Sequence, residues 1–191
     1  MLKTPFVVGI GGGSCGGKTT FTRNIEETLT DLSLEVMHCD KYYRNPSIQR
    51  VSPYTGVRYK ENNLPESLRQ EELFADFAEK IAPREDAPDI VIIEGLFVLY
   101  WDVIRTNLDL KLFVDLQSDE RIIRRVARHA PFEGAELAAN RYLDLVRYRH
   151  DQFIEPSRWL ADMVINGNHL NGVTLDIICG YIRQQVAARN N

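Results

Sequence analysis

One eight-residue segment, GGSCGGKT at positions 12–19, constrains this chain more than any other feature. It has the pattern G-x-x-x-x-G-K-T and follows an apolar run at residues 6–10. Strand, glycine loop and helix in this order form a cradle for phosphate groups in proteins. The glycines let the backbone turn with its N–H groups inward, and a helix that begins near Lys18 directs its positive dipole end to the same place. The pattern therefore predicts a phosphate-binding loop.

The side chains of this loop predict a nucleotide triphosphate as the ligand. We expect Lys18 to supply a point charge for the β- and γ-phosphates and the Thr19 hydroxyl to ligate Mg²⁺. ATP and Mg²⁺ are therefore the expected cofactors. The residues predicted to bind the nucleotide are Gly12, Gly13, Ser14, Cys15, Gly16, Gly17, Lys18, Thr19 and Thr20.

Length and composition narrow the class of protein further. A chain of 191 residues suits a single domain with a full core, and we expect that domain to span residues 1–191. The net charge of −4 offers no strong field for nucleic acid. Cys15, Cys39 and Cys179 are widely spread, without metal-binding spacing, which favours a reduced, cytoplasmic setting. No apolar stretch approaches the ~20 residues that a bilayer requires, so we expect no membrane contact.

Strand-like and helix-like segments alternate along the chain. Apolar runs predict strands at 6–10, 34–39, 89–95, 110–115 and 163–165. Apolar residues at helical spacing predict helices after the loop, over about 66–82, from Arg121 onward, over about 135–153 and over 175–186. Residues 41–65 have no clear period, and a connection of that length favours a binding segment. The alternation predicts an α/β fold of the P-loop NTPase class, with a five-stranded parallel sheet sandwiched between helices.

Two carboxylates end strands of this predicted sheet, where ligands bind in such folds. Asp40 follows the second strand, which we expect to lie beside the phosphate loop. Its carboxylate can accept a proton from an attacking hydroxyl or lie in the outer shell of a metal. Glu94 lies near the end of the predicted 89–95 strand and precedes Gly95, and we expect it to hold Mg²⁺ through water.

Four arginines recur at helical spacing, at positions 121, 124, 125 and 128. Phosphoryl transfer spreads negative charge over the moving group, which arginines on a mobile lid can neutralise. We assign this role to Arg125 and Arg128 and interpret Arg121 as part of a solvated basic face.

Aromatic residues and histidines give weaker signals. Tyr42 and Tyr43 follow Asp40 and can stack on a base, bind a sugar hydroxyl or simply anchor the loop. Trp101 and Trp159 are predicted to pack in the interior. The histidines at positions 38, 129, 150 and 169 form no cluster in the sequence, and we interpret them as structural.

Five segments of the chain carry a resemblance to a known family. They are GIGGGSCGGKTTF, CDKYYR, IIEGLFVLY, DLKLFVDLQSDERIIRRVAR and VRYRHDQFIEPSRWLADMVINGN. Together they resemble the uridine kinase family of phosphate-loop nucleoside kinases, and the resemblance covers almost the whole chain. Relatives of that family are the nicotinamide riboside kinases, the bacterial pantothenate kinases and the phosphoribulokinases.

The resemblance implies a function and several residue roles. It implies transfer of the γ-phosphate of ATP to the 5′-hydroxyl of a nucleoside or a related small molecule, and it makes a homo-oligomer an expectation. Asp40 matches the base that activates the hydroxyl, and Tyr43 matches the aromatic residue that helps hold the nucleoside. Arg125 and Arg128 match arginines of the family's lid, which we expect over about 124–140.

Three departures from the family pattern leave the identity of the acceptor open. The family has Asp-His-Pro where this chain has Asn63-Leu64-Pro65, so the residue expected to hold the ribose is an amide. Only residues 82–89 are available for the family's base-contacting hairpin. The lid reads Phe132-Glu133-Gly134-Ala135 in place of Arg-Gly-Arg.

Two other functional classes compete with a kinase. Residues 11–16 also match G-x-G-x-x-G, and Asp40 can serve as the ribose-binding acid of a dinucleotide-binding oxidoreductase. The pair Lys18 and Thr19 argues against that class, which has no use for it. The reduced lid and the altered acceptor segment motivate the second alternative, a regulatory protein that senses nucleotides and transfers little or no phosphate.

Overall fold

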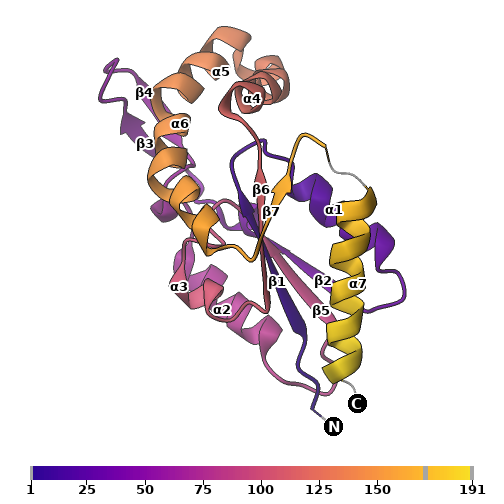
Figure 1. Ribbon diagram of the computed structural model, residues 1–191. Coiled ribbons are helices and arrows are strands. Elements are labelled where there is room, and N and C mark those ends of the chain that lie inside the picture. The colour runs from indigo at the N-terminus through magenta and orange to yellow at the C-terminus, as the bar shows by residue number, and fades with distance from the viewer. Residues whose placement is uncertain (1, 170–171, 190–191) are drawn as a thin grey trace.

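A five-stranded parallel sheet organises the protein. The computed structural model describes residues 2–169 and 172–189 (Figure 1). The strands lie in the order β2-β5-β1-β6-β7, and every neighbouring pair is parallel. This confirms the predicted α/β class with its five parallel strands. Their bounds are β1 (Phe6–Gly12), β2 (Leu34–His38), β5 (Ile90–Glu94), β6 (Leu110–Asp115) and β7 (Met163–Asn166).

The strand order separates the first two strands of the chain. The second strand, β2, does not lie beside β1, because β5 lies between them and pairs with both. In register, Glu94 is opposite Ile10 of β1 on one side and His38 of β2 on the other. A dinucleotide-binding sheet of order 3-2-1-4-5-6 instead places its second strand next to its first. The observed order therefore argues against the oxidoreductase alternative.

Helices cover both faces of the sheet. α1 (Lys18–Thr28) and α7 (Gly172–Arg189) pack on one face, and α2 (Gln70–Ile81) and α3 (Asp102–Arg105) lie on the other (Figure 1). Side chains of β1 alternate between two buried clusters, one on each face. Because residues on both faces are buried, the strands read as continuous apolar runs in the sequence.

Helices and a hairpin lie beyond the carboxyl ends of the strands (Figure 1). α4 (Ser118–Glu133) and α5 (Ala135–Arg141) lie above this end of the sheet (Figure 1). Gly134 joins them with φ 86°, a conformation that favours glycine. The chain then continues as one helical rod, defined here as residues 135–160, in which the segments at 142–146 and 150–154 are π-helical. The predicted helix over 135–153 is therefore present but contains widened turns.

The segment 41–65 is more regular than its sequence predicts. It contains the antiparallel hairpin β3 (Ile48–Val51) and β4 (Arg58–Glu61). Both strands are short and mostly polar, and only alternate residues of β4 are buried, so they give little periodic signal. The hairpin lies against the helical rod (Figure 1).

The helix predicted over 66–82 begins later, at Gln70. Before it, Pro65–Ser67 form a short 3₁₀ helix and Leu68 is extended. The backbone N–H of Arg69 donates to the carbonyl oxygen of Tyr42, and that of Arg44 donates to the carbonyl oxygen of Ser67. These bonds attach the start of α2 to the turn that carries Asp40.

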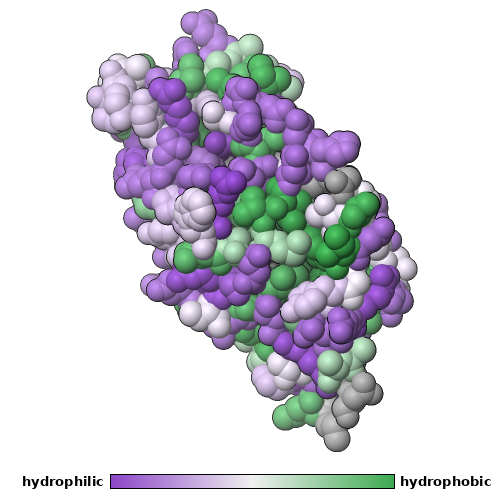
Figure 2. Space-filling model, viewed as in Figure 1, coloured by the Kyte–Doolittle hydropathy of each residue, from purple (hydrophilic) through white to green (hydrophobic). Residues whose placement is uncertain are grey.

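On the face shown in Figure 2, an apolar patch lies over β7 and the start of α7. Its exposed side chains are Met163, Val164, Val173, Ile177 and Tyr181. In the described part of the chain, no helix has the length and apolar character needed to cross a bilayer.

The two tryptophans have opposite environments. Trp101 is buried against Phe97 and Phe74, with ring centroids 5.4 and 5.3 Å away, as the sequence predicts. Trp159 is 82% exposed, so its prediction as an interior residue is wrong. It lies on the last turn of the helical rod, where a 3₁₀ helix turns it toward solvent.

This contrast predicts unequal costs for the same substitution. Trp101→Ala should lower the free energy of unfolding by about 3–5 kcal/mol, because it leaves a cavity in the core. Trp159→Ala is the matched control and should change it by less than about 0.5 kcal/mol. Urea denaturation of both variants measures the difference, and equal losses would contradict the described packing.

Candidate active site

The glycine loop is built around three unusual backbone conformations. Gly12, Cys15 and Gly17 have φ of 139°, 61° and 101°. A Cβ on Gly12 would lie 2.3 Å from the carbonyl oxygen of Val114, so the loop approaches β6 too closely for any side chain. α1 begins at Lys18 without a side-chain cap, so the N–H groups of its first turn are available to an anion.

Lys18 lies at the centre of the loop. It is buried, and its Nζ donates a hydrogen bond of 3.0 Å to the carbonyl oxygen of Gly13. Burial lowers the pKa of Lys18, while Glu94 and Asp40 oppose that shift by favouring the ammonium form. A cation withdrawn from water in this way is strongly attracted by a phosphate group.

The predicted residues converge on one cavity of about 200 Å³. Its walls come from the loop, the ends of β2 and β5, the segment after β4, and α4. The lining residues are Ser14–Thr20, Asp40, Tyr43, Asn62, Asn63, Glu94, Leu96, Arg125, Arg128 and His129. Gly12 and Gly13 do not line the cavity: Gly12 ends β1, and the carbonyl oxygen of Gly13 accepts the N–H of Gly16 and the Nζ of Lys18. Asn62 and His129 are lining residues that the sequence analysis missed.

Glu94 is held by two side chains from different elements. Its Oε1 accepts a hydrogen bond of 3.2 Å from the Thr19 hydroxyl and lies 2.8 Å from Nδ1 of His38. The sequence predicts only a structural role for His38, so its contact with the Glu94 carboxylate was not expected. The only signal for it is the register that places His38 opposite Glu94, which requires knowledge that β2 and β5 are neighbours.

Asp40 lies on the turn that follows β2, Cys39–Tyr42, and faces the same cavity. Its side chain is open to the solvent of the cavity mouth, but the surrounding walls remove much of its bulk water. This desolvation raises the pKa of Asp40 above its ordinary value, and Glu94 adds to the rise while Lys18 opposes it. A raised pKa makes the carboxylate a better proton acceptor.

The arginines of α4 do not share one environment. Arg125 is buried and donates from Nη1 to Oγ of Ser14 at 3.1 Å, and Arg128 is exposed at the cavity.

Arg121 is 5% exposed, so its prediction as a solvated residue is wrong. It packs beneath the loop, where a Cβ on Gly13 would lie 2.7 Å from its Nη1. Burial arises because the helical rod covers this part of α4 with His150.

The loop after β7 supports the phosphate loop from outside. Arg124 donates to the carbonyl oxygen of Gly167 at 3.3 Å. A Cβ on Gly167 would lie 2.3 Å from the carbonyl oxygen of Gly16 and 2.8 Å from that of Asp115. The two glycine-containing loops are therefore in close backbone contact.

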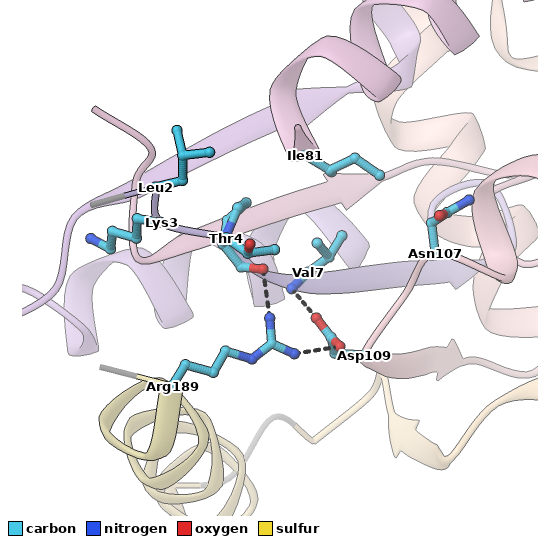
Figure 3. Close-up of a pocket in the computed structure, with 9 residues that line it drawn as sticks. Leu2, Lys3, Thr4, Val7, Ile81, Asn107, Asp109 and Arg189 are labelled. Atoms are coloured by element: carbon cyan, nitrogen blue, oxygen red, sulfur yellow. Dashed lines mark hydrogen bonds and ion pairs between the residues drawn. The ribbon is translucent and has the colours of Figure 1, made fainter. Parts of the chain in front are cut away.

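A second hollow, of about 720 Å³, lies at the opposite, amino-terminal end of the sheet (Figure 3). There Arg189 donates to the carbonyl of Pro5 and pairs with Asp109, whose other oxygen accepts the N–H of Val7. Because these charged groups already have partners in the wall, this hollow offers less to a charged ligand than the loop cavity does.

Fold and site together define the class of protein. The strand order, the glycine loop with Lys18 and Thr19, and the carboxylates at the ends of β2 and β5 are those of a P-loop kinase.

Comparisons with known proteins give the family. The model of the Phosphoribulokinase / Uridine kinase family matches residues 68–173. The chain is 33% identical over 205 residues to the uridine kinase of Clostridium tetani, covering 97% of this chain and 98% of that protein. It is 31% identical over 208 residues to the uridine kinase of Bacillus pumilus, covering 99% of both. The chain belongs to the phosphoribulokinase/uridine kinase family, and it is an ATP-dependent phosphotransferase with an alcohol group as acceptor.

A solved structure supports the fold. The phosphoribulokinase from Rhodobacter spheroides superposes with a TM-score of 0.59 at 14% identity, covering 84% of this chain and 69% of that chain. At this identity the likeness establishes the arrangement of the elements alone.

The contact between the two loops yields a prediction. Gly167→Ala should weaken Mg·ATP binding about tenfold or more, because its Cβ would displace the backbone at Gly16. Gly180→Ala in α7 is the matched control, since a Cβ there meets nothing within 4 Å. Calorimetric titration with ATP measures both, and unchanged affinity in Gly167→Ala would contradict the described loop contact.

Proposed function

We propose that this protein transfers the γ-phosphate of Mg·ATP to the 5′-hydroxyl of a nucleoside. One observation carries the proposal: a carboxylate, Asp40, faces the same cavity as Lys18 and the loop. The family supports a nucleoside as the acceptor class, because the most similar relatives reported above are uridine kinases.

The donor set near the loop suits Mg²⁺. The Thr19 hydroxyl and the Glu94 carboxylate are hard oxygen donors, which Mg²⁺ prefers. Among the described residues, no group of three His, Cys, Asp or Glu side chains could hold a metal ion. This agrees with Mg²⁺, which keeps several waters and binds through one or two carboxylates plus substrate phosphates. The ion would neutralise charge on the phosphates, and His38 would hold Glu94 in place.

The chain's own groups divide the remaining work. Asp40 accepts the proton of the attacking hydroxyl. Lys18 and the loop N–H groups hold the phosphates, and Arg125 and Arg128 neutralise charge on the transferred group. Arg125 already contacts Ser14 of the loop. We propose that residues 124–140, which include parts of α4 and α5, act as the lid.

We assign the acceptor to Tyr43, Asn62 and Asn63, which line the same cavity and offer a phenol and two amides. Burial raises the pKa of Tyr43 well above its ordinary value, so the phenol remains a hydrogen-bond donor at neutral pH. Such neutral donors and acceptors fit the hydroxyls of a pentose.

Two substitutions separate the roles of loop and base. Lys18→Ala should lower kcat/KM by about 100-fold or more, because a cation that holds the phosphates is lost. Asp40→Asn should lower kcat by about 100- to 10,000-fold while ATP affinity changes little. Steady-state kinetics with ATP and a panel of nucleosides, alongside ATP titration, measure both effects.

Asp86→Asn serves as the control, because Asp86 is an exposed carboxylate away from the cavity. Survival of turnover in Lys18→Ala would refute the assignment of the loop, and an unchanged kcat in Asp40→Asn would remove Asp40 as the base. ATP binding without transfer to any nucleoside in the wild type would favour the nucleotide-sensing alternative.

The shifted pKa values predict the pH dependence. Asp40 acts as a base only when ionised, so activity should be lost as pH falls through its raised pKa, at a pH above the ordinary value of 3.8. Lys18 acts only when protonated, so activity should be lost as pH rises through its lowered pKa, at a pH below 10.5. A profile of kcat/KM against pH tests this, and an acidic limb at or below 3.8 would contradict the desolvation of Asp40.

A further inference from the structure

The cavity wall formed by Asn62 and Asn63, called the acceptor wall below, directly follows a strand that ends in a buried carboxylate. β4 ends at Glu61, and the next residues, Asn62 and Asn63, line the cavity. Glu61 has no exposed surface. A carboxylate withdrawn from water in this way is costly unless hydrogen bonds and an opposite charge compensate it. The hydrogen-bond partners of the Glu61 carboxylate therefore indicate its role.

Glu61 uses its two oxygens on two different parts of the molecule. Oε1 accepts the backbone N–H of Asn63 at 2.8 Å, and Oε2 accepts Nε of Arg149 at 3.2 Å. Arg149 lies on the helical rod, between its two π-helical segments, and its Nη1 also donates to Gln152 at 3.0 Å. One side chain thus joins the backbone of the acceptor wall to the rod.

Other contacts hold the hairpin on the rod without reaching the cavity. The carboxylate of Asp144 accepts the hydroxyls of Thr55 and Tyr59, each at 2.8 Å. The rings of Tyr54 and Tyr148 stack with centroids 4.3 Å apart. These contacts bind the body of the hairpin, whereas only Glu61 among these side chains reaches Asn63.

The rod is continuous with the helices that carry the lid arginines. It begins with α5, which follows α4 through Gly134, and α4 supplies Arg125 and Arg128 to the cavity. Glu61 and Arg149 therefore connect the backbone of Asn63 to the same run of helices that brings Arg125 and Arg128 to the cavity.

We propose that Glu61 and Arg149 are positioning residues that set the acceptor-binding wall at Asn63 relative to the lid. This rests on the proposed function, since it assigns the wall to the nucleoside. Neither residue touches the reacting atoms. The pair should therefore govern the KM for the nucleoside and leave the KM for ATP almost unchanged.

The test compares three single variants of the full chain. Arg149→Met keeps the apolar stem and removes the guanidinium, and Glu61→Gln keeps an acceptor for the Asn63 N–H but removes the charge. Both should raise the KM for the nucleoside about tenfold and change the KM for ATP by less than about twofold. Tyr59→Phe, the control, removes a bond between hairpin and rod away from the cavity and should leave both KM values unchanged.

Two further measurements keep the proposal falsifiable. The double variant Glu61→Gln/Arg149→Met should be no worse than the more impaired single variant, because both break one interaction. Amide hydrogen exchange at Asn63 should accelerate in Arg149→Met and stay unchanged in Tyr59→Phe, which needs no nucleoside as substrate. If Glu61→Gln does not fold, the Arg149→Met variant alone tests the proposal. We expect that variant to fold, because the Arg149 side chain is already 25% exposed.

The outcomes are distinguishable from failure of the proposed function. A wild type that phosphorylates no nucleoside refutes that function, while exchange at Asn63 still reports on the pair. A folded Arg149→Met variant with an unchanged nucleoside KM and unchanged exchange overturns the proposal. An equal rise in KM for ATP, or the same rise in Tyr59→Phe, would show a general structural role and would also overturn it.

Discussion

The buried ammonium of Lys18 is the constraint on which the rest of the site depends. It is withdrawn from water, held by the carbonyl of Gly13, and stabilised in its charged form by Glu94 and Asp40. That arrangement requires the tight turns at Gly12 and Gly17 and the close approach of β6. It also requires β5 beside β1, because only this strand order places Glu94 next to the loop. A cavity that concentrates charge in this way is suited to a polyphosphate and its metal ion.

The remaining elements supply what the loop cannot. The turn after β2 presents a carboxylate whose pKa is raised by its surroundings, and α4 brings Arg125 onto Ser14. The segment after the hairpin adds the amides of Asn62 and Asn63 to the cavity wall. Since catalysis of phosphoryl transfer is mostly positioning and charge neutralisation, the relative placement of these parts matters more than any single group. The contacts of Glu61 connect two of them.

The sequence predicts those parts of the site whose signal is local. The loop, Asp40, Glu94 and Arg125 each lie in or directly after a recognisable segment, and all of them meet in the cavity. His38 and Asn62 could not be found in this way, because their roles depend on strand pairing and on a polar hairpin with little periodicity. The spacing of the arginines along α4 also does not show which of them other elements cover. Arg121 is buried because the helical rod packs over it. The lid over 124–140, the single domain, a homo-oligomer and a cytoplasmic location stay predictions.

A crystal structure of the protein with Mg²⁺, a nonhydrolysable ATP analogue and uridine tests the central claim most directly. The account predicts the triphosphate in the loop with its terminal phosphate at Lys18, and the 5′-hydroxyl within hydrogen-bonding distance of the Asp40 carboxylate. Triphosphate bound away from the loop, or a 5′-hydroxyl directed away from Asp40 with the terminal phosphate in place, would contradict it.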